Sequence, residues 1–206
     1  MRAKSWKTFD QFTYLNISSF KKILLLSDAG RGALELESRK TSEQLLISTD
    51  INQKPGVNLI ADNNKLPFRE NSFDFIYLNR GLCPCRGAIA CGGINTQRDS
   101  MTSFLNSIIH MLDKKNPNSL AILTGFYFPG LFGKTVPTLW RTVVDEMQAA
   151  NPQLQIGLLT ADGMSNTVEY GFIGVVISTD RTKPNSQRIN ELYPMPVMHP
   201  DTQLFF

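Results

Sequence analysis

The sequence predicts an α/β protein whose mixed β-sheet is covered by helices on both faces. Seven short apolar runs are spaced along the chain and separated by segments of helical or turn composition, which is typical of strands buried on both sides. Only a short turn at residues 161–166 joins the last two runs, which is too little for a helical crossover. We therefore expect five strands in crossover units, followed by an antiparallel pair.

The predicted strands begin with a leucine-rich run near the N-terminus and end with a run rich in glycine, valine and isoleucine. They occupy residues 22–27, 44–49, 57–61, 73–78, 119–124, 154–160 and 170–178. Turn residues or helical patterns separate them, so each run is expected to be one strand.

Two helices are predicted in the second half of the chain. Over residues 100–112, apolar side chains recur three and four positions apart from Met101 to Leu112, so one stripe should face the sheet. This helix should stop at the polar turn at residues 113–117. A second helix is predicted over residues 138–149, because Pro137 precedes it and Asn151-Pro152 follows it, as start and stop signals do.

The length and composition suit one domain with a full core. The chain has 206 residues, of which 42% are hydrophobic and 19% are charged. We expect a single domain over residues 1–180. The tail at residues 181–206 holds four of the eleven prolines, and we interpret it as an ordered cap, an oligomer contact or a disordered end.

Charge and hydropathy restrict the possible partners. The net charge of +3 comes from residues of both signs spread along the chain, so a nucleic-acid partner is permitted but not indicated. The N-terminus lacks the apolar core of a signal peptide, and no segment reaches the roughly 18 to 20 apolar residues that a bilayer span needs. We therefore expect a cytosolic (cytoplasmic) protein with no membrane partner. The sequence predicts no particular oligomeric state.

Polar or glycine residues follow the first four predicted strands. Residues 27–32 follow the first strand, Asp50 the second, Asp62 the third and Asn79 the fourth. In an open α/β sheet, a ligand binds outside the carboxyl ends of the strands, near the point where the strand order reverses. Glycines in the first loop let backbone N–H groups approach a ligand, and a carboxylate about 20 residues later suits a ribose diol. Each feature alone also fits an ordinary turn or helix cap, but together they favour a nucleoside site.

Residues 62–76 read DNNKLPFRENSFDFI, which matches the pattern D-x-x-x-L-P-F-x-x-x-S-F-D-x-I. In this respect the chain resembles class I S-adenosylmethionine-dependent methyltransferases, in particular the small-molecule, type 11-like members. The later MTSFLNSIIHMLDKKNPNSLAILT is similar to the family's helix, basic turn and fifth strand. The resemblance covers roughly residues 20–178. It implies a Rossmann-like seven-stranded sheet of order 3-2-1-4-5-7-6, with helices on both faces and the seventh strand antiparallel between the fifth and the sixth.

The resemblance also implies an activity, namely methyl transfer from S-adenosylmethionine to a small-molecule acceptor. The implied cofactor-binding residues are Ser27, Asp28, Gly30, Asp50, Ile51, Asp62, Asn63 and Asn79, and the implied acceptor-binding residues are Arg80, Cys83, Cys85 and Tyr127. In this assignment Asp50 holds the ribose hydroxyls, Asp62 accepts from the adenine amino group, and Asn79 lies near the sulfonium. Two carboxylates beside an apolar slot suit a cationic sulfonium nucleoside better than a dinucleotide, because they repel the phosphates of a dinucleotide.

The first motif departs from the family pattern. Leu25 stands where the family has an acid inside the first strand, and Ser27-Asp28-Ala29 stands where small glycines are usual. Asp28 could supply the missing carboxylate from a shifted position. Only twelve positions separate Asp50 from Asp62, which leaves no room for the usual helix between the second and third strands. The alternative is a catalytically inactive relative that serves as a binding or assembly module.

All three cysteines lie at residues 81–93, GLCPCRGAIACGG, after the fourth predicted strand. Cys83, Cys85 and Cys91 could be thiolate ligands of a metal, but the paired C-x₂-C spacing of common zinc sites is missing. Pro84-Cys85 is similar to the nucleophile of methyltransferases that modify C5 of pyrimidines, which would make Cys85 catalytic, although the rest of that motif is absent. We favour the third interpretation, in which the thiols are small buried groups of a tight loop.

Other residues have both a functional and a structural interpretation. Arg80 and Arg86 could hold an anionic acceptor, although arginines at strand ends are more often solvated or paired. Tyr127 and Phe128 could wall the acceptor pocket or belong to the core. His110 lies beside the buried stripe of its helix, and we interpret it as structural. We find no convincing general base, which fits methyl transfer by positioning.

Overall fold

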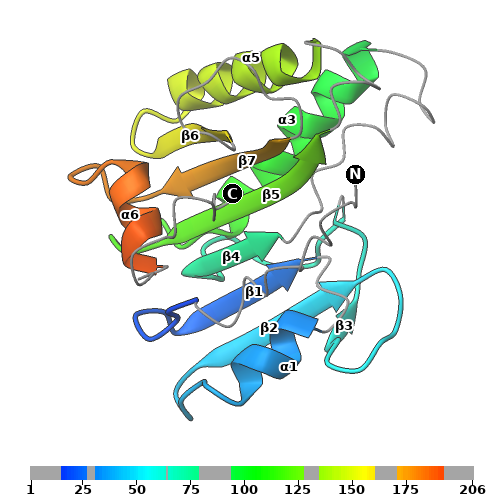
Figure 1. Cartoon of the computed structure of the whole chain (residues 1–206), viewed down its shortest axis with the longest axis vertical. Helices are drawn as coiled ribbons and strands as arrows, with labels where there is room; N and C mark the ends of the chain where they lie inside the picture. Colours follow the sequence, from blue (N-terminus) through cyan, green and yellow to red (C-terminus); the bar gives the residue numbers. More distant parts are fainter. Residues whose placement is uncertain are drawn as a thin grey trace, which may run out of the picture.

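The computed structural model describes residues 15–26, 31–63, 65–78, 94–127, 135–160 and 171–192. Its strands are β1 (Lys22–Leu26), β2 (Leu45–Asp50), β3 (Leu59–Ile60), β4 (Phe75–Leu78), β5 (Leu120–Tyr127), β6 (Gln155–Thr160) and β7 (Gly171–Ser178). The helices in these ranges include α1 (Arg31–Glu37), α3 (Ile94–Met111), α5 (Thr135–Ala150) and α6 (Asn185–Leu192). Figure 1 shows the strands side by side in one twisted sheet.

The strand order is β3-β2-β1-β4-β5-β7-β6. Strands β1 to β5 are parallel to one another, and β7 is antiparallel to both β5 and β6. The predicted mixed sheet and its antiparallel last pair are therefore confirmed, and so is the strand order that the resemblance implied.

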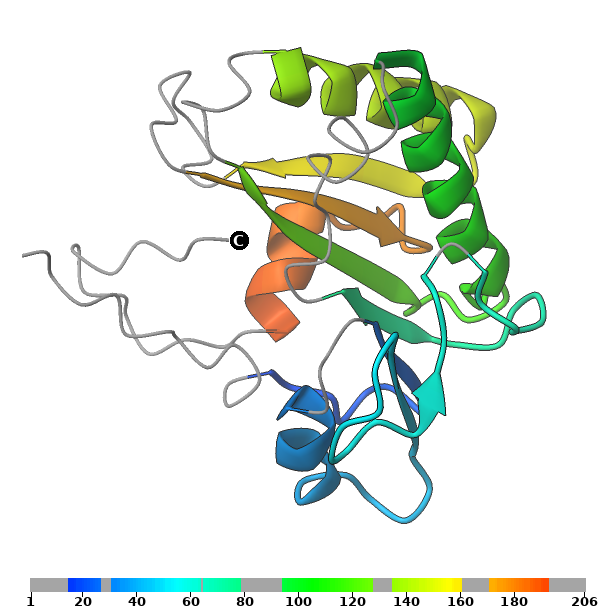
Figure 2. The same cartoon turned by 90° about the vertical axis from the view of Figure 1, so that its right-hand side faces the viewer.

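Both faces of the sheet are buried, because alternate side chains of each strand point to opposite faces. In β1, Leu24 and Leu26 belong to the hydrophobic cluster that includes residues of α3 and α5. Ile23 and Leu25 belong to a second cluster, which includes residues of α1 and α6. Figure 2 shows α3 and α5 on one side of the sheet and α1 and α6 on the other. This arrangement explains why the strand sequence is continuously apolar rather than alternating.

Both predicted helices exist, but each begins earlier than the sequence pattern indicated. Helix α3 starts at Ile94 rather than at residue 100. The sequence pattern missed its first turns because they lack the apolar stripe that defined the predicted segment. Helix α5 starts at Thr135 and includes Pro137 in its first turn. Proline is tolerated there, because the N–H groups of a first turn have no partner within the helix.

The connection between β2 and β3 contains a turn and no helix, as the short spacing of Asp50 and Asp62 predicted. The Val57 N–H donates to the Lys54 carbonyl at 3.0 Å, and Gly56 between them has a φ of 86°. Proline at the second position and a positive φ at the third are the features of a type II turn, and Pro55-Gly56 supplies both. Strand β3 itself has only two residues, although the sequence pattern indicated residues 57–61.

Helix α6 lies in the segment from residue 181, for which the sequence left three alternatives. Its last residue, Leu192, is buried, and the Leu192 carbonyl accepts a hydrogen bond of 2.8 Å from the Asn16 N–H. The Arg188 guanidinium donates to the Asn118 carbonyl at 2.6 Å and lies 3.5 Å from the Asp180 carboxylate. Helix α6 therefore joins the N-terminal segment to the turn before β5. A domain boundary at residue 180 stays a prediction.

Candidate functional site

The candidate site is the edge of the sheet where the parallel strands end. Strands β1 and β4 are neighbours, so the strand order reverses between them. The crevice at such a reversal is where open α/β sheets bind their ligands. The described residues at this edge include Asp50 and the residues beside it, together with the exit of β3.

Asp50 is the last residue of β2 and is buried, with 8% of its surface exposed. Its Oδ1 accepts a hydrogen bond of 2.9 Å from the Asn52 N–H, which fixes the orientation of the carboxylate. The preceding Thr49 hydroxyl donates to the Leu25 carbonyl at 3.3 Å and so ties the end of β2 to β1. A carboxylate held at a strand end in this way is a preorganised hydrogen-bond acceptor.

Asp62 follows β3 and is brought close to Asp50 by the sheet. Ile60 is paired with Asp50 in the parallel register, and the Ala61 N–H donates to the Asp50 carbonyl at 3.0 Å. Asp62 is exposed, and its carbonyl accepts a hydrogen bond of 2.9 Å from the Lys65 N–H. The two acids therefore come from adjacent strand ends.

Two uncharged residues accompany these acids. Ile51 follows Asp50, and its apolar side chain is 58% exposed. Asn63 follows Asp62 and is half-buried. The described part of the predicted cofactor site thus contains two carboxylates, one amide and one apolar surface.

Of the other predicted site residues, only Tyr127 falls within the described ranges. Ser27, Asp28, Gly30, Asn79, Arg80, Cys83, Cys85 and Cys91 lie outside the described residues. Tyr127 is the last residue of β5, whose backbone ends at the same edge as β1 to β4. Within the described ranges, no group of three His, Cys, Asp or Glu side chains could hold a metal ion. The interpretations of the three cysteines, including the metal site, therefore stay predictions.

Much of the segment that carried the family resemblance is structural. Leu66 and Phe68 pack against the cluster that α3 and α5 cover. The rings of Phe68 and Phe73 meet edge to face, with centroids 4.8 Å apart and an interplanar angle of 88°. These apolar positions hold the connection between β3 and β4 onto the sheet, and the described residues of this connection contain no helix.

The polar residues of the same segment cap the C-terminal end of α3. Asn71 adopts a φ of 56°, a left-handed conformation that asparagine tolerates better than most residues. From there the N–H groups of Asn71 and Ser72 donate to the His110 and Met111 carbonyls, at 3.0 and 2.9 Å. These carbonyls are among the groups that a helix leaves without internal partners. The segment therefore closes the helix end.

The side chain of Asp74 ties β4 to the beginning of β1. Its two carboxylate oxygens accept hydrogen bonds of 2.8 Å from the N–H groups of Lys21 and Lys22. Asp74 is buried, with 5% of its surface exposed. The second acid of the family pattern is thus a structural clamp, and sequence reasoning had given it no role.

One exposed ion pair lies near the α3 cap. The Lys114 ammonium is 3.0 Å from the Glu70 carboxylate. The hydrogen bond from Lys114, followed by the charge of that ammonium, lowers the pKa of Glu70 below its usual value. A pair this exposed has little effect on the stability of the fold.

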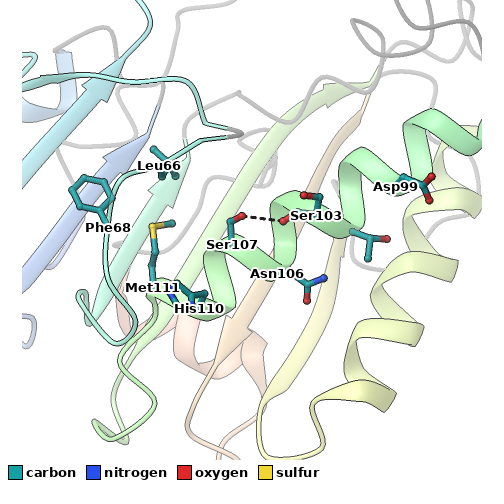
Figure 3. Close-up of a pocket in the computed structure, with 9 residues that line it drawn as sticks. Leu66, Phe68, Asp99, Ser103, Asn106, Ser107, His110 and Met111 are labelled. Carbon is teal, nitrogen blue, oxygen red and sulfur yellow. Dashed lines mark hydrogen bonds between the residues drawn. The ribbon is translucent and has the colours of Figure 1, made fainter.

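A groove of about 640 Å³ runs along α3 and contains none of the predicted cofactor residues. Figure 3 shows Leu66 and Phe68 on one side of the groove and Ser103, Ser107 and His110 of α3 along the other. The Ser107 hydroxyl donates to the Ser103 carbonyl at 3.0 Å. The groove lies along the flank of the helix and not at the ends of the strands, so it plays no part in the nucleoside site.

Leu25 is one of the departures from the family pattern in the first motif. This residue, at the position of the family's acid, is completely buried in the cluster that includes residues of α1. A leucine in this place strengthens the core but offers no polar group to a ligand. Any carboxylate that serves the same purpose must come from another position.

No protein-family model and no curated protein matches the sequence. Among solved structures, the plantazolicin methyltransferase BpumL in complex with a monoazolic desmethylPZN analogue and SAH is 9% identical, with a TM-score of 0.50, and the match covers 79% of this chain and 77% of that one. At this identity the likeness concerns the fold: the chain has the fold of S-adenosylmethionine-dependent methyltransferases.

Two further structures match with lower scores. Human N-acetylserotonin methyltransferase in complex with SAM is 12% identical over 82% of this chain and 50% of that one, with a TM-score of 0.45. TrmN from Thermus thermophilus is 16% identical over 77% of this chain and 43% of that one, with a TM-score of 0.44. Within the residues that the structure describes, no helix has the length and apolar content to cross a bilayer.

Proposed function

We propose that the protein is a methyltransferase that uses S-adenosylmethionine and acts on a small-molecule acceptor. The observation that carries this proposal is the arrangement of Asp50 and Asp62 at adjacent strand ends, in the sheet order of known methyltransferases. Solved methyltransferase structures of this fold contain SAM or SAH, which supports S-adenosylmethionine as the cofactor of this protein.

The described residues fit a cationic nucleoside. The Asp50 carboxylate is suited to accept from both hydroxyls of a ribose, and the Asn52 N–H holds it in place. Asp62 is exposed one strand away, where it can accept from an adenine amino group, while the Asn63 N–H lies next in the chain. The exposed Ile51 offers an apolar surface to the adenine ring. Two carboxylates also attract the positive charge of a sulfonium.

The contribution of the chain to the reaction is positioning. When bound, S-adenosylmethionine supplies an electrophilic methyl group. Asp50 and Asp62 would hold the nucleoside end of the cofactor, which would leave the ends of β4 and β5 for the acceptor. Holding the two reactants in this geometry removes much of the entropic barrier, and no general base is then required if the acceptor is a reactive nucleophile.

Isothermal titration with SAH tests the binding step. We expect saturable binding in the micromolar range for the wild type. Asp50→Asn keeps the shape of the side chain but removes its charge, and it should weaken binding on the order of tenfold to a hundredfold, the value of one or more charge-assisted hydrogen bonds. Asp113→Asn is the matched control, because Asp113 lies in the turn before β5 at the opposite end of the sheet. Absence of heat at millimolar SAH would reject the proposal.

The alternative is an inactive relative that binds partners without catalysis. The buried Leu25, in place of the acid of the first motif, favours this alternative. Mass spectrometry of small molecules that copurify with the protein, followed by incubation with methyl-labelled S-adenosylmethionine, separates the two functions. Transfer of label to a copurified molecule supports the enzyme, whereas SAH binding without any transfer supports the inactive relative.

A further inference from the structure

The position of Asp62 depends on a very short strand. Strand β3 has two residues, and residues 51–58 before it form a loop in place of a helix. Strand β3 also lies at the edge of the sheet, where β2 is its only neighbour among the described strands. The contacts between β2 and residues 58–61 must therefore hold the exit of β3 in register.

The side chain and backbone of Asn58 extend this pairing beyond the two ladder residues. The Asn58 Oδ1 accepts a hydrogen bond of 2.9 Å from the Ser48 N–H, and the Asn58 N–H donates to the Ser48 carbonyl at 3.0 Å. An amide side chain thus takes the place of a main-chain acceptor at the edge of β2. Ser48 is completely buried, so losing this acceptor would be costly for its N–H group.

We propose that Asn58 is a positioning residue, which holds the β3 exit against β2 and so fixes Asp62 relative to Asp50. Asn58 is at one end of the paired segment, and the bond from Ala61 to the Asp50 carbonyl is at the other. With Asn58 intact, Asp62 directly follows Ala61, whose N–H is bonded to the Asp50 carbonyl. The consequence for ligand affinity rests on the function proposed above, whereas the clamp itself does not.

Native-state hydrogen exchange of the full-length protein tests the clamp directly. In Asn58→Ala, the Ser48 and Ala61 amides should exchange about tenfold faster than in the wild type, since a net hydrogen bond is worth about that factor. Asn58→Asp keeps an oxygen acceptor on a side chain of the same length, and it should restore slow exchange. Asn106→Ala removes an exposed asparagine from α3 and serves as the control. If Asn58→Ala does not fold, Asn58→Ser is measured in its place.

Titration with SAH then measures positioning as distinct from general stability. Asn58→Ala should bind SAH about threefold to tenfold more weakly, because a smaller fraction of molecules has the competent register, and Asn58→Asp should bind like the wild type. An Ala61 exchange rate that is the same in Asn58→Ala as in the wild type overturns the inference. If the wild type binds SAH, an equal SAH affinity in Asn58→Ala overturns it as well. If the wild type does not bind SAH at all, the proposed function fails, while the exchange rates still decide whether Asn58 is the clamp.

Discussion

A substitution at the buried Asp74 should change the stability of the fold without changing ligand binding at the candidate site. Asp74→Asn is nearly isosteric, but an amide has one acceptor oxygen where the carboxylate has two. One of the two 2.8 Å bonds to the Lys21 and Lys22 N–H groups must therefore be lost, and an NH₂ group then faces a backbone N–H. The site contains no atom of this residue, so ligand binding should be preserved.

The magnitude follows from the type of hydrogen bond. Bonds to a charged acceptor contribute about 1.5 to 3 kcal/mol each, and water can reach part of this region, so we expect a loss of about 2 kcal/mol. In a protein of this size, 1 kcal/mol corresponds to about 2 to 4 °C, and the midpoint of thermal unfolding should fall by about 4 to 8 °C.

Thermal unfolding followed by circular dichroism measures this change, and SAH titration below the transition measures binding. Asp113→Asn provides the same chemical change in the turn before β5, where the half-buried Asp113 side chain accepts a hydrogen bond of 3.0 Å from the Lys115 N–H, and its midpoint should move by about 1 °C or less. Equal midpoints for the two variants would show that the Asp74 bonds do not stabilise the fold. Loss of SAH binding in folded Asp74→Asn would show that this end of the motif does belong to the site.

Three further substitutions test other parts of the fold. Gln44→Ala removes a buried side chain that donates to the Ile17 and Phe20 carbonyls and accepts from the Thr41 N–H, and thermal unfolding should show a loss of about 3 kcal/mol. Leu25→Asp places an unpaired carboxylate in the core and should destabilise the protein by more than about 3 kcal/mol, so a folded variant with an unchanged urea midpoint would contradict the burial of this side chain. The pKa of Asp180 is lowered from its ordinary value of 3.8 by hydrogen bonds from Thr182 and then by the charge of Arg188, so its contribution to stability is present above that value and is lost as the pH falls through the lower, folded pKa. In Thr182→Val, an NMR titration should find the Asp180 pKa closer to 3.8, and an unchanged value would exclude the Thr182 hydroxyl as a cause.

The chain illustrates how a sequence motif can carry two kinds of information. Its opening acid, Asp62, lies just after β3, where the strand pattern of the sequence had placed it. Its later residues pack the sheet, cap α3 and, through Asp74, hold β1. A close match to such a pattern therefore indicates the fold more directly than it indicates activity, because most of its positions are fixed by packing.

The sequence by itself determined the sheet class, the seven strands and the antiparallel final pair, because burial on both faces and short connections leave a local pattern in the chain. It also predicted that no helix fits between β2 and β3, since that depends only on the number of residues. The tertiary structure decided which polar side chains support the site: Asn58 bonds to Ser48 and Asp74 bonds to Lys21 and Lys22, ten and more than fifty positions away. Such bonds depend on strand register and on neighbours distant in the chain, and a local pattern of residues contains neither.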